Sequence, residues 1–377
     1  MKILHTADWH VGKRLQGRSR ADEHEQVLDE IVELARGRAV DLVLVAGDMF
    51  DSAAPTPESE KLVYATLTRL GALAPTVAIA GNHDGGRRLE AIAPLLSLAG
   101  VHAHPFIPSN GAPVEMTTGS GETARIAVLP WVSQRFIVKA EHLMDEDADD
   151  LSGRYSDRLR AIIAKLGEGF AANAVNVYLG HITIAGGEMG GGERTAQTIF
   201  DYWIDPTAFP ASAHYVALGH LHKMQTMPAS CPIHYCGSPL QLDFSDTDEN
   251  RYALVVDAAP GIPVEVEPVA LTSGRRLRTL RGTLEQLRAA GGTTGDDYLR
   301  IVVEEPPRAT LADEVRDLFP NAIKVLVDWA PDQDAVPRRR AEGASPTELF
   351  GSYLEERGMV DGAMIELFQE LYEEASA

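Results

Sequence analysis

The sequence predicts an α/β fold, with β-sheets flanked by helices, followed by a smaller α+β domain and C-terminal helices. Three observations predict it. Apolar strand-like runs alternate with amphipathic helical patterns through the first third of the chain. Strands such as DLVLVAGD (41–48) are apolar throughout, which indicates a sheet covered on both faces by helices. A compact βαβαβ pattern of its own then occupies residues 273–332.

The elements of the larger domain follow in order. KILHTAD is expected as a strand, and a helix near residues 24–36 carries an apolar stripe. DLVLVAGD, a helix over 57–73 and the strand TVAIAGNHD come next. The middle third is richer in strands, which we expect at ARIAVLPWV, VNVYLGHIT, HYVALGHLH, PIHYCGSP and RYALVVDA.

The last third divides into three parts. The small domain needs strands at LRTLRG, YLRIVVEE and IKVLVDWA, with helices at TLEQLRAA and LADEVRDLF between them. Proline, charged and small residues mark 333–346 as a linker. Two amphipathic helices follow within 347–377. The predicted domains are therefore 1–272, 273–332, the linker 333–346, and 347–377.

Composition sets limits on location and partners. The chain has 377 residues, no apolar run long enough for a membrane span, and a charged start unlike a signal peptide, so we expect a cytoplasmic protein without a membrane partner. Its two cysteines are expected to be reduced. The net charge of −21 argues by itself against nucleic-acid binding. Basic residues are clustered, however, so net charge leaves that question open.

Polar side chains follow the predicted strands, and in most cases a glycine directly precedes them. Because ligands bind at the carboxyl ends of strands in such sheets, we expect these side chains to meet. The Asp-x-His and His-x-His spacings each place two groups on one face of an extended tip. The candidate ligands are Asp8, His10, Asp48, Asn82, His181, His220 and His222.

These seven groups predict a centre with two metal ions. Carboxylate, amide oxygen and imidazole suit Mn²⁺, Fe²⁺ or Zn²⁺ better than Ca²⁺ or Mg²⁺. Seven ligands exceed what one ion takes, whereas two ions that share Asp48 would use them all. Such a pair serves in-line displacement at phosphorus, with a bridging hydroxide as the attacking group. His83 is assigned to the leaving oxygen, and Asp84 to orienting His83 or the turn.

Less specific explanations exist for several of these features. Any one histidine alone is more often structural, and His5, His24, His142, His214 and His234 are interpreted so. The HAH at 102–104 has ligand spacing but lacks the apolar run and glycine that precede the other motifs. The two cysteines with one histidine are too few for a closed tetrahedral site. The glycine-rich loop 186–195 is expected as a flexible loop at the rim of the site.

The ordered pattern DWH…GD…GNHD…GH…GHLH resembles the calcineurin-like metallophosphoesterase signature, and most closely that of the SbcD family of nuclease subunits. MKILHTADWHVGKRL, LVLVAGDMFD, CGSPLQLDFSD and SPTELFGSYLEERG are similar to that family. The resemblance implies a metallophosphoesterase nuclease core and a capping domain that helps to place DNA. It also implies C-terminal helices that dock onto an SbcC-type ATPase, and a homodimer within a heterotetramer.

The expected function is metal-dependent hydrolysis of DNA, as exonuclease and endonuclease, in repair and recombination, with two divalent ions expected to be Mn²⁺. A phosphatase or cyclic-nucleotide phosphodiesterase is the alternative, and a scaffold without chemistry is a third. Lys13, Arg14 and Arg18 are candidate DNA contacts. The C-terminal apolar residues would pack either on this chain's own core or in a partner groove. They are Leu349, Phe350, Met364, Ile365, Leu367, Phe368 and Leu371.

Overall fold

A computed structural model describes residues 1–132, 148–193, 203–246, 250–329 and 362–376, together with residues 347, 350, 351 and 354. These residues form two compact units. The first comprises Met1–Glu304 and Ala309–Leu326, and the second comprises Glu305–Arg308 and Val327–Ala377.

The first unit contains two six-stranded sheets. The first sheet has the order β16-β15-β1-β4-β5-β6. Strands β1, β4, β5 and β6 run parallel, while β15 and β16 form an antiparallel edge. Their bounds are β1 Lys2–Thr6, β4 Leu42–Val45, β5 Thr76–Ile79, β6 Val101–His104, β15 Arg251–Ala259 and β16 Ile262–Leu271.

The second sheet has the order β13-β14-β12-β9-β8-β7. Its four central strands are parallel, and both edge strands are antiparallel to their neighbours. The bounds are β7 Val114–Thr117, β8 Thr123–Leu129, β9 Val175–His181, β12 Tyr215–Gly219, β13 Gln225–Met227 and β14 Ile233–Tyr235. Every strand predicted in the larger domain is thus present.

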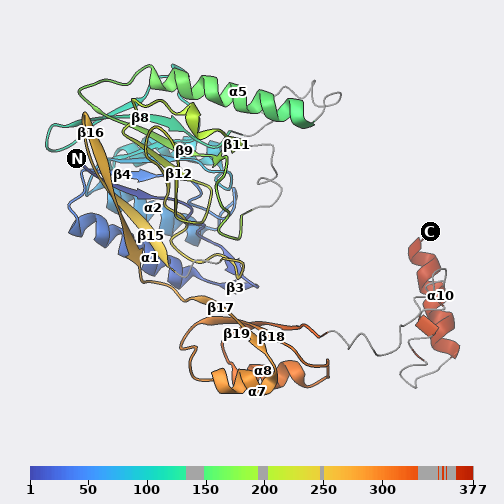
Figure 1. The fold of residues 1–377 in the computed structure, drawn as a ribbon. Coiled ribbons are helices and arrows are strands. Elements are labelled where there is room, and N and C mark those ends of the chain that lie inside the picture. Colours follow the sequence, from blue (N-terminus) through green and yellow to red (C-terminus); the bar gives the residue numbers. More distant parts are fainter. Residues whose placement is uncertain are drawn as a thin grey trace. The chain divides into compact units, whose positions relative to one another are not determined.

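The two sheets pack face to face with helices outside them, which corrects one expectation. Residues such as Ile3 and Leu44 of the first sheet share a buried cluster with Ile126 and Val177 of the second. Helices α1 (Ala21–Gly37), α2 (Pro57–Gly71) and α3 (Gly86–Ser97) cover the outer face of the first sheet, and α5 (Ala148–Gly167) covers that of the second (Figure 1). The strands are apolar throughout because one face of each sheet packs against helices and the other face packs against the second sheet. The prediction that helices cover both faces of the sheet was therefore wrong.

Short elements lie between the longer strands of each sheet. A hairpin of β2 (Arg14–Leu15) and β3 (Arg18–Ser19) follows β1. Strands β10 (Thr183–Ile184) and β11 (Trp203–Ile204) pair in parallel, and the 3-10 helix η2 spans Pro206–Ala208.

The predicted βαβαβ unit is present. It consists of β17 (Leu277–Gly282), α7 (Leu284–Ala290), β18 (Tyr298–Val303), α8 (Leu311–Leu318) and β19 (Ala322–Val327). The sheet order is β17-β18-β19. A capping box from Thr283 and Gln286 starts α7, and Leu287, Ile301 and Val315 are among the buried residues between the sheet and its helices.

The second unit ends in helix α10, Gly362–Ser376. Four of its large apolar side chains are exposed, namely Met364, Leu367, Leu371 and Tyr372. Phe368 and Ile365 are half-buried, and the Phe368 ring stacks on Phe350 with ring centres 4.3 Å apart. Leu349, also predicted to bind a partner, lies outside the described residues. Within the described part of the chain, no helix is both long and apolar enough to span a membrane.

Candidate metal centre

The seven predicted ligands come together where five strands end. Asp8, His10 and Asp48 follow β1 and β4, and Asn82 follows β5, all in the first sheet. His181 ends β9, and His220 and His222 follow β12, in the second sheet. Apart from Asn82, which is half-buried, all of these residues are buried. The centre therefore lies where the carboxyl ends of both sheets meet, as expected for parallel strands.

The backbone at the centre is held in unusual conformations. The φ values of Asp8, His10, Asp48 and His220 are 53°, 46°, 48° and 101°. Residues other than glycine rarely adopt positive φ values. Such conformations cost of order 1–3 kcal/mol each and cluster at functional sites. Their occurrence at four predicted ligands indicates that the fold is built to place these side chains.

Glycine at position 81 lets the ligands pack closely. A Cβ atom there would lie 2.2 Å from Asp48 Oδ1 and 2.4 Å from the Asp48 nitrogen. No side chain fits at that separation, so the glycine before Asn82 is required by close approach.

One group of candidate ligands is Asp8, His10 and His222, whose possible ligand atoms all lie within 4.8 Å of one another. The Nε2 atoms of His10 and His222 are 3.1 Å apart. The Nδ1 of His222 donates to the Gly191 carbonyl at 2.8 Å, which leaves a lone pair on its Nε2. The Asp8 carboxylate accepts from the His220 nitrogen at 3.0 and 3.1 Å.

A second group is Asp48, His181 and His220, joined by Asn82. His181 Nδ1 donates to the Ala46 carbonyl at 2.7 Å, so its Nε2 faces Asn82 Oδ1 at 2.9 Å and Asp48 Oδ2 at 3.4 Å. His220 Nδ1 lies 2.9 Å from the same Asn82 oxygen. An Nε2 that faces two acceptor oxygens needs positive charge there, which either its own proton or a bound cation supplies.

The chemistry of these groups fits cations. Burial lowers the pKa of His10 to about 3 and lowers that of His220, so both rings are neutral, as metal ligands must be. Burial alone would lower the pKa of His181, but the Asp48 carboxylate raises it to about 9, so a cation bound there would take the place of the Nε2 proton. His220 Nε2 and His10 Nδ1 are buried without a hydrogen-bond partner in the described structure. Because Asp48 also belongs to a group with His10 and His83, it is placed to be shared.

His83 lies beside the ligands, in a different orientation from Asn82. Its main-chain nitrogen donates to Asp48 Oδ1 at 2.7 Å, and its Nδ1 donates to the Asp51 carbonyl at 2.8 Å. The ring centre is 4.6 Å from that of His10. With Nδ1 engaged, Nε2 is the atom left to exchange a proton.

The Asp84 carboxylate accepts hydrogen bonds from the turn that follows β5 and from the main chain after Asp48. The donors are the main-chain nitrogens of Gly81, Phe50 and Met49, at 2.9, 3.0 and 3.4 Å. Of the two roles considered for Asp84, these contacts support orientation of the turn. Burial, followed by the charge of Asp48, raises its pKa to about 7.

Sequence reasoning missed three residues around the centre. Asp51 Oδ1 lies 3.5 Å from His10 Nδ1 and 3.9 Å from His83 Nδ1. Glu193 accepts from the His222 nitrogen at 3.0 Å, so the glycine-rich loop reaches a ligand. The Trp131 ring lies over His220 at 5.1 Å. Trp131 follows β8 as the ligands follow their strands, a signal that could have found it.

The remaining histidines and the cysteines lie elsewhere in the fold. His5 is buried between Tyr215 and the Leu218 carbonyl, and His24 donates to the Arg20 carbonyl. His102 and His104 are in β6, and no ligand cluster among the described residues includes them. His142 lies outside the described residues. Cys231 and Cys236 are buried and free.

The chain matches a known family along most of its length. Residues 1–224 match the model of the calcineurin-like phosphoesterases. The SbcD subunit of the SbcCD nuclease of Bacillus subtilis (strain 168) is 35% identical over 282 residues, 74% of this chain and 71% of that protein. The chain belongs to the SbcD family. The SbcD subunit of Rhodobacter capsulatus is 33% identical over 69% of this chain and 67% of that protein. The SbcD subunit of Escherichia coli K12 is 27% identical over 91% of this chain and 86% of that protein.

Membership in the SbcD family confirms the resemblance predicted from the strand-end motifs. The matched segment contains every predicted ligand, from Asp8 to His222. The ligand groups brought together by the structure therefore belong to the calcineurin-like phosphoesterase region of this SbcD relative.

Proposed function

We propose that this chain is the metal-dependent nuclease subunit of an SbcCD-type complex and hydrolyses phosphodiester bonds of DNA. The observation that carries the proposal is the meeting of the ligand groups at Asp48, whose carboxylate lies 3.7 Å from His10 Nε2 and 3.4 Å from His181 Nε2. A shared carboxylate is what two neighbouring cations need.

The ligands divide between two divalent ions, for which we propose Mn²⁺. Asp8, His10 and His222 would hold one ion and Asn82, His181 and His220 the other, with Asp48 common to both. Bound there, the ions would neutralise charge on the phosphodiester and lower the pKa of water towards about 7.

The chain's own residues position the ligands and exchange protons. Gly191 and Ala46 fix the rings of His222 and His181 through their carbonyls. His83, held by the Asp51 carbonyl, presents Nε2 to the leaving oxygen of the substrate. Asp84 holds the turn that carries Asn82 and His83.

The proposed protein partner binds helix α10 of the second unit. The exposed apolar side chains of α10 support docking of an SbcC-type ATPase. A homodimer within a heterotetramer and a cytoplasmic location complete the proposal.

The test is hydrolysis by the purified full chain. We expect Mn²⁺-dependent cleavage of linear duplex and hairpin DNA, abolished by a chelator. His102→Ala is a matched control, because His102 has ligand spacing but lies outside the clusters, and should cleave as the wild type does. Metal-loaded protein that leaves DNA intact would overturn the proposal. Faster turnover of phosphate monoesters or cyclic nucleotides than of DNA would favour the phosphatase or phosphodiesterase alternative.

A further inference from the structure

Some basic side chains of the described residues make an ion pair or a hydrogen bond within the chain, and others make neither. Two of the three predicted DNA contacts are engaged within this chain. Lys13 Nζ lies 3.3 Å from Asp51 Oδ1, and Arg14 donates through Nε to the Gly17 carbonyl at 3.0 Å. Four arginines lie close together in sequence at positions 275, 276, 278 and 281. Two of them are also paired, Arg278 with Asp297 at 3.3 Å and Arg281 with Glu304 at 2.9 Å.

Arg18 and Arg275 differ from these. Within the described residues, neither guanidinium makes an ion pair or a hydrogen bond. Instead both lie near the ring of Tyr298, with guanidinium carbons 5.5 and 5.0 Å from the ring centre. Both arginines are exposed. The two guanidinium carbons are therefore at most 5.5 + 5.0 = 10.5 Å apart, although the residues are 257 positions apart in sequence (275 − 18).

Tyr298 is a fixed support for the two guanidiniums. Only 5% of its surface is exposed, and it shares a buried cluster with Leu15, Phe244 and Leu277. That cluster joins the β2–β3 hairpin to the βαβαβ unit. A guanidinium over an aromatic ring is attracted by its π face and keeps N–H donors at its edge. Because the ring of Tyr298 already restrains the two arginine side chains, they lose less conformational entropy when they bind an anion.

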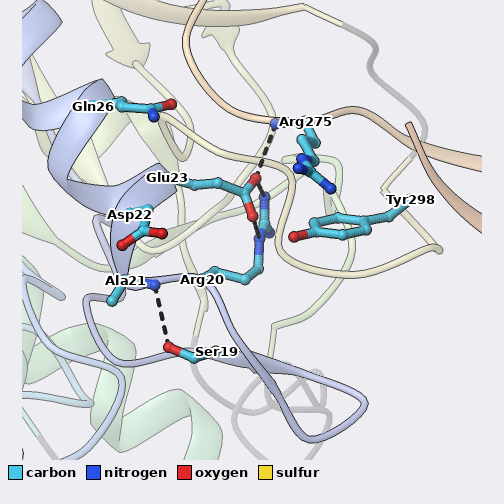
Figure 2. Close-up of a pocket in the computed structure, with 8 residues that line it drawn as sticks. All are labelled: Ser19, Arg20, Ala21, Asp22, Glu23, Gln26, Arg275 and Tyr298. Carbon is cyan, nitrogen blue, oxygen red and sulfur yellow. Dashed lines mark hydrogen bonds and ion pairs between the residues drawn. The ribbon is translucent and has the colours of Figure 1, made fainter. Parts of the chain in front are cut away.

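A cavity of about 230 Å³ adjoins this support. Figure 2 shows Arg275 and Tyr298 on one side and the start of α1 on the other. Glu23, the one buried carboxylate there, is occupied by Arg20, whose Nε and Nη2 donate at 3.0 and 2.7 Å, and by the Arg275 nitrogen at 2.9 Å. Arg18, Arg20 and Arg275 against Asp22 and Glu23 give a local charge of 3 − 2 = +1, on a chain of net charge −21.

We propose that Arg18 and Arg275, supported by Tyr298, bind a phosphodiester of the DNA backbone outside the metal centre. This inference rests on the proposed nuclease function and names where the substrate is held. Each guanidinium can donate two parallel N–H bonds to the oxygens of a phosphate. Arg18 is eight positions from His10 in sequence (18 − 10), so their Cα atoms are at most about 28 Å apart, the length of about eight base pairs. One DNA segment can therefore span both sites.

The experiment measures binding of a duplex to the full chain in a chelator, which prevents cleavage, over a range of KCl concentrations. Arg18→Ala and Arg275→Ala should each weaken binding about tenfold at low salt and reduce the slope of log K against log[salt] by about 1. Arg18→Lys should restore the slope because it keeps the charge. Arg36→Ala is the matched control, since Arg36 is an exposed arginine that pairs with Glu33, and it should bind as the wild type does.

Several results would overturn the site. Wild-type affinity and salt slope in both alanine variants, or a wild-type chain that does not bind DNA, would each do so. Inorganic phosphate should compete with DNA no better than chloride at matched ionic strength, and selective competition would assign the site to free phosphate instead. Far-UV circular dichroism checks that each variant is folded. Metal-dependent hydrolysis by the wild type is measured separately, so that its absence would refute the proposed function while the binding result stands.

Discussion

Replacement of Gly81 by alanine tests the packing of the metal centre most directly. The new Cβ would lie 2.2 Å from Asp48 Oδ1, where ordinary contact begins at 3.4 Å, so one of the two must move by 3.4 − 2.2 = 1.2 Å. The new Cβ would also lie only 2.4 Å from the main-chain nitrogen of Asp48, so a shift of the Asp48 side chain alone does not relieve the clash. The φ of Gly81 is not in the left-handed region, so the effect is steric. A displacement of about 1 Å in a catalytic site costs on the order of 100-fold in rate.

We therefore expect Gly81→Ala to lower metal-dependent hydrolysis of a small phosphodiester by about 100-fold and to weaken binding of Mn²⁺ measured by calorimetry. Gly37→Ala is the matched control, because a Cβ there meets nothing within 4 Å. Thermal unfolding of both variants separates a displaced ligand from a lost fold. If folded Gly81→Ala protein binds metal and turns over as the wild type does, Asp48 is not held against this glycine and the account of the centre is wrong.

Three further predictions concern single side chains. Asp48→Ala should remove the shared ligand, lower the bound metal below two ions per chain and reduce cleavage by roughly 1000-fold or more, as metal analysis and a DNA cleavage assay would show. His83→Ala should keep its metal but lose about 10²- to 10⁴-fold in turnover, and a metal-free variant would refute the role given to His83. Burial lowers the pKa of His5 from 6.5 to about 3, so its neutral form stabilises the fold fully above pH 6.5 and less as pH falls towards 3. In a chelator, the difference in free energy of unfolding between wild type and His5→Gln should shrink by about 2 kcal/mol between pH 8 and pH 5, and an unchanged difference would contradict the burial of a neutral ring.

The strand ends were predictable from sequence because a physical rule connects them. An apolar run, a glycine and a polar residue mark the point where a buried strand turns, and parallel strands turn at one edge. The number of sheets did not follow from the same pattern. A strand such as β4 reads as continuously apolar whether its second face meets helices or another sheet, so apolar runs alone cannot distinguish the two arrangements.

The residues missed at the centre act through contacts that leave no local pattern. Glu193 reaches the nitrogen of His222 across 29 positions, and His83 is held by the main-chain carbonyl of Asp51, which any residue could supply. A ligand can be recognised from its own side chain and the strand before it. A residue that orients a ligand can come from any part of the chain, and only the fold determines which part lies beside the ligand.

The availability of a basic side chain also depends on the fold. Their closeness in sequence suggested that Lys13, Arg14 and Arg18 act alike. In the fold, the Asp51 carboxylate, 38 positions away (51 − 13), pairs with Lys13, whereas Arg18 lies over the ring of Tyr298, 280 positions away (298 − 18). What determines whether a basic residue is available to DNA is therefore the acid that the fold places beside it. Within the described residues many lysines and arginines have such a partner, so the exposed arginines that lie against a ring instead of a carboxylate are the ones to examine for contact with DNA.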